Sequence, residues 1–287
     1  MEVTILEPSG YCSGVERAME IAFSTKKDNP SKEVVVLGML VHNADSLKEL
    51  EQKGIKTIYK ENCSYEQLVD EIKTPSIVIL TAHGHKKIIE ERLLNNGHEI
   101  VDATCPFVKN SFKEILDATK ANRTVFYIGV NDHPEAVAAL SLSDNVYFIN
   151  AKRQDIPIKF VKSPLVISQT TLSKYEVKQI NDAILKIYPD AEFLNGICNA
   201  STKRQESLMN LSDDIDLIYI VGGANSNNSK TLFNLATSLY PNKKVLLIQN
   251  ANDIKEKDLQ GLCHVAISSG ASTPKKIINE IKNKLLN

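Results

Sequence analysis

The sequence lacks several features that mark common classes of protein. It has no tryptophan, and no apolar run is long enough to span a bilayer, since runs such as 77–80 and 218–221 have the length of buried strands. Its 34 lysines and arginines are balanced by 35 acidic residues, so the basic excess typical of nucleic-acid-binding proteins is missing. The first residues carry no basic and apolar leader. We therefore expect a cytoplasmic protein that binds neither membranes nor nucleic acids.

Common metal and cofactor motifs are missing as well. No C-x-x-C pair is present, which excludes a zinc ribbon and a bacterial ferredoxin run. No P-loop lysine motif occurs, which argues against a nucleoside triphosphate, and no flavin or nicotinamide fingerprint is found. The chain does contain five cysteines. Because thiols stay reduced in the cytoplasm, these cysteines indicate metal binding or catalysis rather than disulfides.

Short apolar runs alternate with amphipathic stretches along the whole chain. The apolar runs are rich in valine and isoleucine and lack period-two alternation, which is typical of strands buried on both faces. We predict strands over 3–6, 34–37, 77–80, 100–103, 125–128, 146–149, 165–168, 217–221, 245–248 and 265–268. We predict helices over 15–26, 45–53, 86–95, 109–121, 174–187, 202–211, 231–239 and 274–286. This alternation predicts an α/β fold with mainly parallel sheets.

Three of the cysteines recur at an even spacing. Cys12, Cys105 and Cys198 lie 93 residues apart (105 − 12 and 198 − 105), and each follows a predicted strand and opens a predicted helix. Two further polar positions recur after each cysteine, first at His42, His133 and Ser226, then at His83, Thr170 and Ser272. All nine positions stand where a strand ends, so the period is structural as well as chemical.

The period predicts three related α/β domains around a pseudo-threefold axis. A chain of 287 residues exceeds what one hydrophobic core usually serves. The period alone sets the boundaries at 13–104, 105–197 and 198–287, with the N-terminal strand in 1–12 completing the third domain. Each domain would turn the carboxyl ends of its strands, where open α/β sheets bind ligands, toward one central cavity.

Three thiolates that converge on one point can bind zinc or an iron–sulfur cluster. A cubane cluster has four irons, so three cysteines would leave one iron free to bind a substrate oxygen, whereas an electron carrier would use four cysteines. Alternatively, the three are buried core residues, since free cysteine is often buried. The loop position of Cys12 weakens that alternative, but the spacing alone leaves both open. Cys63 and Cys263 do not fit the period and are interpreted as structural.

Histidine, serine and asparagine residues stand at the other predicted strand ends. Next to helix N-termini, whose N–H groups are unpaired, they suit a phosphate or diphosphate, although they can also be simple helix caps. The third domain has 225–229 and 268–272, rich in serine and asparagine, in place of histidines. Glu135 is either a favourable first-turn carboxylate or, beside a cluster, a proton donor with a raised pKa. Thr170 could pass a proton or hold a substrate hydroxyl.

Nine short segments together resemble the hydroxymethylbutenyl diphosphate reductase family, known as IspH or LytB. They are Gly-Tyr-Cys-Ser-Gly-Val-Glu-Arg, Leu-Val-His-Asn, Ala-His-Gly, Asp-Ala-Thr-Cys-Pro, His-Pro-Glu, Ser-Gln-Thr-Thr-Leu, Cys-Asn-Ala-Ser-Thr-Lys-Arg-Gln, Asn-Ser-Asn-Asn-Ser and Gly-Ala-Ser-Thr-Pro. Each segment is weak alone, but nine in the right order are specific, and they cover essentially the whole chain. The resemblance implies three α/β domains around an iron–sulfur cluster.

The resemblance also implies a role for each matching residue. A [4Fe-4S] cluster with one open iron would be held by Cys12, Cys105 and Cys198. The diphosphate would be bound by His42, His83, Ser226, Asn228 and Ser272, with His133 lining the same pocket. Glu135 would be the proton source, assisted by Thr170. One departure is Asn227, which stands where the family usually has a second serine and whose amide can still bind a phosphate oxygen.

The implied reaction is reductive dehydroxylation of (E)-4-hydroxy-3-methylbut-2-enyl diphosphate to isopentenyl diphosphate and dimethylallyl diphosphate, the last step of the non-mevalonate isoprenoid pathway. Electrons would come from a separate donor, ferredoxin or flavodoxin, because no flavin or nicotinamide fingerprint is present. One alternative is an iron–sulfur hydro-lyase, which needs no net electrons. Another is a non-enzymatic iron–sulfur sensor or zinc-binding protein, although the chain shows no basic helix for nucleic acid.

Overall fold

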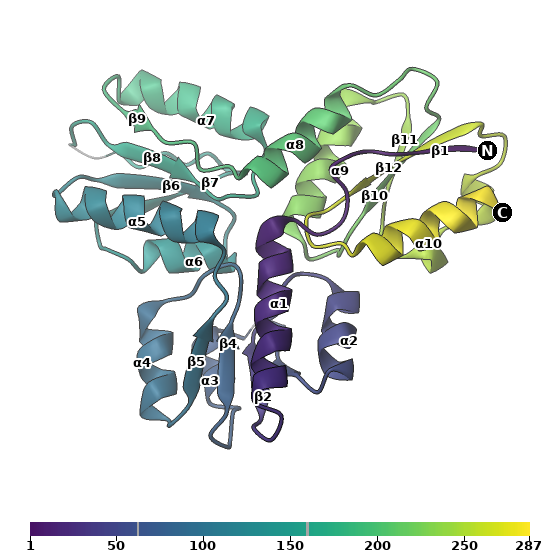
Figure 1. The fold of residues 1–287 in the computed structure, drawn as a ribbon. Helices are drawn as coiled ribbons and strands as arrows, with labels where there is room; N and C mark the ends of the chain where they lie inside the picture. The colour runs from purple at the N-terminus through teal and green to yellow at the C-terminus, as the bar shows by residue number, and fades with distance from the viewer. Residues whose placement is uncertain (62, 159–160) are drawn as a thin grey trace. The chain divides into compact units, whose positions relative to one another are not determined.

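A computed structural model describes residues 1–61, 63–158 and 161–287, whose strands form three four-stranded parallel sheets (Figure 1). The chain divides into two compact units. The first unit comprises 1–15, 42–46 and 198–287, and the second unit comprises 16–41 and 47–197. Among the described residues, no helix combines the length and the apolarity that crossing a bilayer would require.

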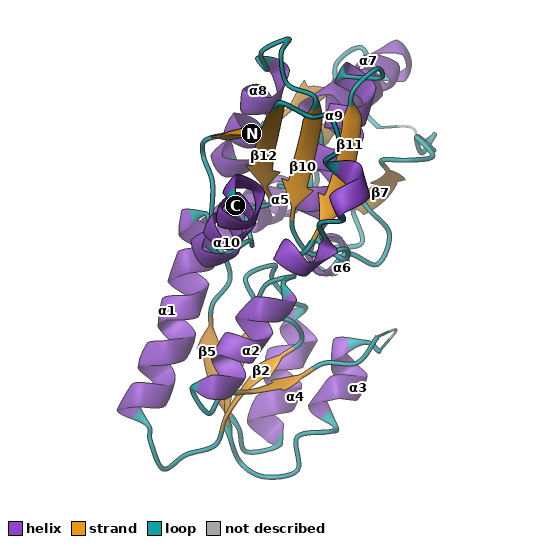
Figure 2. Ribbon diagram, turned by 90° about the vertical axis from the view of Figure 1, so that its right-hand side faces the viewer, coloured by secondary structure: helices purple, strands orange, loops and turns teal. Residues whose placement is uncertain are grey.

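The sheet of the first unit has the strand order β1-β12-β10-β11, with every neighbouring pair parallel. Its strands are β1 (Glu2–Ile5), β10 (Leu217–Val221), β11 (Lys244–Ile248) and β12 (His264–Ser269). Its helices are α8 (Asn199–Met209), α9 (Asn227–Leu239) and α10 (Lys275–Leu286), with short turns η1 (Ala251–Asp253) and η2 (Glu256–Asp258). Figure 2 shows β12, β10 and β11 side by side.

Strand β10 explains why the sequence shows no period-two alternation. Leu217 and Tyr219 enter an apolar cluster on one face of the sheet, and Ile218 and Ile220 enter a second cluster on the other face. Every side chain of β10 is therefore buried, as expected for a parallel strand that helices cover on both sides.

The second unit contains two sheets. The first has the order β3-β2-β4-β5, from β2 (Val34–Leu37), β3 (Lys56–Ile58), β4 (Ile77–Leu80) and β5 (Glu99–Asp102). The second has the order β7-β6-β8-β9, from β6 (Val125–Gly129), β7 (Val146–Asn150), β8 (Leu165–Ser168) and β9 (Glu192–Phe193). All their neighbouring pairs are parallel as well.

Seven helices lie wholly or mainly in the second unit among the described residues, and two of them, α1 and α2, begin in the first unit. They are α1 (Ser13–Asp28), α2 (Ala44–Gln52), α3 (Tyr65–Val69), α4 (Lys87–Asn95), α5 (Pro106–Lys120), α6 (Pro134–Leu140) and α7 (Lys174–Ile187). Strand β6 is buried on both faces in the same way as β10: Phe126 and Ile128 enter one apolar cluster, and Val125 and Tyr127 enter another.

The predicted α/β class with parallel sheets is confirmed, and each predicted strand is present to within one residue at either end. Helices α5, α8 and α9 begin three or four residues earlier than predicted. The first turns of α8 and α9 are polar and carry no apolar period, whereas α5 begins with the apolar residues Pro106, Phe107 and Val108. Two short edge strands, β3 and β9, and the short helix α3 escaped prediction, and the extent of the short helix α6 was not predicted although Glu135 was interpreted as a possible first-turn residue. The domain boundaries taken from the period stay predictions.

Candidate functional site

Two of the three evenly spaced cysteines lie in the first unit, each directly before a helix. Cys12 precedes α1, and Cys198 is the N-cap of α8. Both side chains are half-buried, and neither is in a disulfide. The Cys198 sulfur accepts a hydrogen bond from the Ser201 N–H (3.4 Å), so a thiol takes the capping role that serine or asparagine usually has. The partial positive charge of a helix N-terminus favours negative charge at both positions.

A chain of hydrogen bonds connects these two cysteines. The Cys198 thiol donates to Ser201 Oγ (3.2 Å), and Asn228 Nδ2 donates to the same oxygen (3.1 Å). Asn228 Oδ1 accepts from the Ala271 N–H (2.9 Å), and the Ala271 carbonyl accepts from the Cys12 N–H (3.0 Å). One buried asparagine, which the resemblance assigns to the diphosphate, therefore also connects the Ser201 side chain with the Ala271 backbone.

Arg204 of α8 is a buried cation beside the two thiols, with 2% of its surface exposed. Its guanidinium donates to the carbonyls of Ser269 (3.1 Å), Ala200 (3.1 Å) and Gly10 (2.7 Å). Burial lowers the pKa of Arg204, while electrostatic interaction with Cys12, Cys198 and Glu7 acts in the opposite direction. Arginine stays charged in proteins, so a fixed positive charge lies next to both sulfurs.

The predicted diphosphate residues of the first unit gather at the N-terminus of α9 and the loop after β12. Ser226 is the N-cap of α9, where its Oγ accepts from the Ser229 N–H (3.3 Å), and Asn227 and Asn228 form the first turn. Ser272 Oγ donates to the His42 carbonyl (3.4 Å). These side chains lie at the N-terminus of a 13-residue helix, where the partial positive charge suits an anion.

His42 reaches this edge because a glycine permits a close backbone approach. A Cβ atom on Gly223 would lie 2.6 Å from the His42 carbonyl oxygen, so a larger residue would displace the segment 42–46. Burial, reinforced by the charge of Lys230, lowers the pKa of His42 below its ordinary value. The lowered pKa favours the neutral form of the imidazole.

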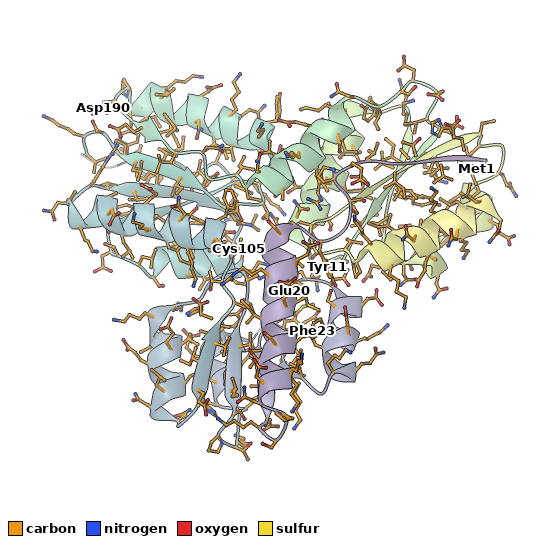
Figure 3. The ribbon with its side chains drawn as sticks, viewed as in Figure 1. Met1, Tyr11, Glu20, Phe23, Cys105 and Asp190 are labelled. Carbon is orange, nitrogen blue, oxygen red and sulfur yellow. The ribbon has the colours of Figure 1, made fainter. Side chains whose placement is uncertain are left out.

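The third cysteine lies in the second unit, at the N-cap of α5 (Figure 3). Cys105 is half-buried and is not in a disulfide. Pro106 takes the first helical position, where a missing N–H breaks no hydrogen bond. The Cys105 N–H donates to the Ala82 carbonyl (3.0 Å), which places the cysteine next to the loop that carries His83.

His83 and His133 form a pair in the second unit. Their ring centroids are 5.6 Å apart, and the rings meet edge to face at 87°. His133 is the N-cap of α6, and its Nδ1 accepts from the Glu135 N–H (3.2 Å). That contact leaves Nε2 as the nitrogen that carries a proton in the neutral ring, so this nitrogen is the one able to donate to a ligand.

Glu135 is a buried carboxyl group with three donors around it. Only 1% of its surface is exposed. Its Oε1 accepts from the Thr170 N–H (2.8 Å) and from the Tyr127 hydroxyl (3.0 Å), and its Oε2 accepts from Thr170 Oγ1 (2.7 Å). Burial raises the pKa of Glu135 to about 7, although Thr170 and Tyr127 act to lower it. Such a group can carry a proton at neutral pH and still release it.

Each unit thus assembles its own part of the predicted site. The first unit brings together Cys12, His42, Cys198, Ser226, Asn227, Asn228 and Ser272. The second unit brings together His83, Cys105, His133, Glu135 and Thr170. Sequence reasoning did not identify Arg204, Ser201 or Tyr127. The first two lie within a segment that carries the family resemblance, whereas Tyr127 has no sequence signal beyond its place in an apolar strand.

The other two cysteines lie apart from these sets in sequence and in setting. Cys63 is half-buried and packs against the apolar cluster of the β3-β2-β4-β5 sheet. Cys263 is exposed, directly before β12. Neither contacts a residue of the predicted site in the hydrogen bonds of the described residues.

Comparison with known proteins gives a match along nearly the whole chain. The family model described as LytB protein matches residues 3–286. A 4-hydroxy-3-methylbut-2-enyl diphosphate reductase from Malacoplasma penetrans is 33% identical, over 98% of this chain and 96% of the relative. A reductase of the same name from Caldanaerobacter subterraneus is 30% identical, over 99% of this chain and 96% of the relative.

Two solved structures share the fold. The E-1-hydroxy-2-methyl-but-2-enyl-4-diphosphate reductase from Plasmodium falciparum has a TM-score of 0.89 and 25% identity, and the match covers 100% of this chain and 88% of that one. A structure of (E)-4-hydroxy-3-methyl-but-2-enyl diphosphate reductase, described as the terminal enzyme of the non-mevalonate pathway, has a TM-score of 0.66 and 28% identity. That match covers 100% of this chain and 99% of the other.

Proposed function

The chain belongs to the LytB protein family, and from that premise we propose that it reduces (E)-4-hydroxy-3-methylbut-2-enyl diphosphate to isopentenyl diphosphate and dimethylallyl diphosphate. This is the last step of the non-mevalonate (MEP/DOXP) isoprenoid pathway. The substrate takes up two electrons and two protons and loses its hydroxyl group as water. The observation that carries the proposal is that the family match spans residues 3–286 and so includes every residue of the candidate site.

Membership of this family implies an iron–sulfur cofactor, and the described residues fit one. Three reduced cysteines stand directly before helices, and two of them interact electrostatically with the buried cation Arg204. We propose that Cys12, Cys105 and Cys198 hold a [4Fe-4S] cluster and leave one iron without a protein ligand. Such a cluster, when bound, supplies electrons singly and an iron that acts as a Lewis acid toward the substrate hydroxyl.

The residues around the α9 N-terminus bind the diphosphate in this proposal. Ser226, Asn228 and Ser272 offer hydroxyl and amide groups, and the N–H groups of the first turn add donors with a partial positive charge. Asn227 extends this set with an amide. His42 donates from a neutral ring and gains charge when the anion approaches. His83 and His133 complete the set from the second unit.

Glu135, Thr170 and His133 handle the proton. Glu135 holds a proton near pH 7, and Thr170 Oγ1 is 2.7 Å from its Oε2. Thr170 receives this proton and passes its own hydroxyl proton to the leaving oxygen, so the threonine is unchanged and Glu135 becomes a carboxylate. His133 caps the helix that carries Glu135 and thereby fixes where the carboxyl group lies.

The electron donor is a separate protein, and we propose ferredoxin or flavodoxin. This choice rests on the missing flavin and nicotinamide fingerprints. The sequence also predicts a cytoplasmic location, and this location agrees with the choice of donor because ferredoxin and flavodoxin both work in the cytoplasm. Reduction by a chemical donor of low potential should replace the protein partner in an assay.

An anaerobic assay with the allylic diphosphate and a chemical reductant tests the proposal. We expect isopentenyl and dimethylallyl diphosphate to form only when reductant is present. Turnover without reductant would instead support an iron–sulfur hydro-lyase. A purified protein with zinc and without sulfide would contradict both enzymes and favour a zinc-binding role.

A further inference from the structure

Tyr127 is a buried phenol that the proposed mechanism does not yet use. It lies in the middle of β6, with no exposed surface, and its ring packs in an apolar cluster with Ile115, Ala136 and Ala139. Its hydroxyl group donates to Glu135 Oε1 (3.0 Å). A phenylalanine would fill the same apolar space, so the hydroxyl contributes a hydrogen bond rather than packing.

The contacts of Glu135 distinguish its two carboxyl oxygens. Oε1 accepts from the Thr170 N–H, which can only donate, and from the Tyr127 hydroxyl. Oε2 has one partner among these donors, Thr170 Oγ1, and a hydroxyl group can either donate or accept. Burial and the neighbouring Glu135 charge raise the pKa of Tyr127 well above its ordinary value, so the phenol keeps its proton. Oε1 is therefore occupied by two donors.

We propose that Tyr127 is a positioning residue that keeps the proton of Glu135 on Oε2, facing the hydroxyl of Thr170. This inference rests on the proposed function, because it assigns a direction to the proton that Glu135 supplies there. Glu135 then releases its proton from Oε2 to Thr170 Oγ1, and the negative charge that remains is stabilised on Oε1 by two hydrogen bonds.

Other titratable groups near Glu135 act less directly. His133 caps the same helix, His83 contacts the His133 ring, and Tyr147 lies on β7, which packs against α6. The charged residues of α5 are exposed or half-buried; they are Lys109, Lys113, Glu114, Asp117 and Lys120. The causes that set the pKa of Glu135 are burial, Thr170 and Tyr127. Removal of the Tyr127 hydroxyl should therefore change the pKa of Glu135, and no nearby charged side chain should offset that change.

The variant Tyr127→Phe tests the inference by removing one oxygen atom. The carboxylate loses a donor, so we expect the pKa of Glu135 to rise by about one pH unit. The infrared carboxyl stretch of substrate-free protein, titrated with pH, measures this shift without turnover. Glu135→Gln identifies the band. In turnover, the loss of kcat on the alkaline side should move to higher pH by the same amount.

Tyr219→Phe is a matched control. Tyr219 is likewise fully buried in the middle of a strand, β10, and its hydroxyl has no hydrogen-bond partner among the described residues. Removing that hydroxyl should leave both the carboxyl band and the pH profile unchanged. A titration of Tyr127→Phe that matches wild type would overturn the inference.

A second substitution tests the inference with the opposite sign and covers a Tyr127→Phe protein that does not fold. Incorporation of 3-fluorotyrosine at residue 127 makes the phenol a stronger donor, so the pKa of Glu135 should fall. An unchanged or raised pKa would contradict the inference. If wild-type protein reduces the allylic diphosphate and neither change shifts the pH at which the carboxyl band titrates, only the inference fails. If wild-type protein shows no reduction, the proposed function itself fails.

Discussion

The two compact units present different chemistry at the ends of their strands. The first unit offers two thiols, a fixed arginine and a set of hydroxyl and amide donors around a helix N-terminus. The second unit offers one thiol, a histidine pair and a buried carboxyl group with a pKa of about 7. The residues of the first unit suit the binding of an anion beside the fixed positive charge of Arg204, and those of the second unit suit proton transfer. The same four-stranded parallel sheet therefore recurs along the chain, but the side chains at the strand ends differ between the two units.

Replacement of the cysteines should give the largest effect, because each is a proposed ligand of the cluster. Two of them lie in the first unit and one lies in the second unit. Cys105→Ser, Cys12→Ser and Cys198→Ser should each abolish turnover and reduce the iron and sulfide content. Cys63→Ser and Cys263→Ser provide matched controls outside the period, and they should keep both. Full activity in a Cys105→Ser protein would show that the second unit supplies no ligand to the cluster, which would contradict the roles given to the two units.

Glu135→Gln should separate proton transfer from binding. Glutamine keeps the size of the side chain but has no carboxyl proton to release, so turnover should fall by about 10²- to 10⁴-fold. Iron content and affinity for the diphosphate should stay close to wild type. In the wild type, kcat should fall as pH rises through about 7, because Glu135 must be protonated to act as a donor. A variant with wild-type kcat would remove Glu135 from the mechanism.

Arg204→Gln should lower the reduction potential of the bound cluster. Reduction adds negative charge, and the loss of a buried cation beside two sulfurs makes that charge less stable. We expect a shift on the order of 60 mV, which corresponds to a tenfold change for one electron. Lys203→Gln removes a charge from the exposed neighbouring position and should leave the potential close to wild type. Equal shifts in both variants would show that Arg204 has no special position.

Asn227→Ser should give the smallest effect. It restores the residue that the family resemblance leads us to expect, and it exchanges one hydrogen-bonding group for another at the start of α9. KM should change by less than about tenfold, with kcat unchanged. Asn225→Ser, at an exposed position just before the helix, provides a control that should not change KM. A large loss of kcat would give Asn227 a role beyond binding.

The sequence allowed prediction of every long strand because parallel strands buried on both faces form continuous apolar runs. Strands β3 and β9 escaped because they have only three and two residues. The extent of helix α6 was not predicted because seven residues are too few to show a helical period. The same short helix carries Glu135, so its contacts with β6 could not be foreseen.

Two of the site residues that the sequence did not reveal, Arg204 and Tyr127, share one physical cause. Arg204 and Tyr127 act through partners that are close only after folding: Gly10 is 194 positions from Arg204, and Thr170 and Tyr127 both converge on Glu135. A charged residue on a helix is usually solvated, and an aromatic residue in an apolar strand usually packs in the core. Motif matching places residues in a site, but it does not reveal which buried groups hold them.

The iron and acid-labile sulfide content of the anaerobically purified chain tests the central claim most directly. The claim is that thiols from both units share one inorganic cluster. The account predicts about four irons and four sulfides per chain, with a loss of both when Cys105 is replaced. Iron and sulfide that persist at wild-type levels without Cys105, or zinc in their place, would contradict it.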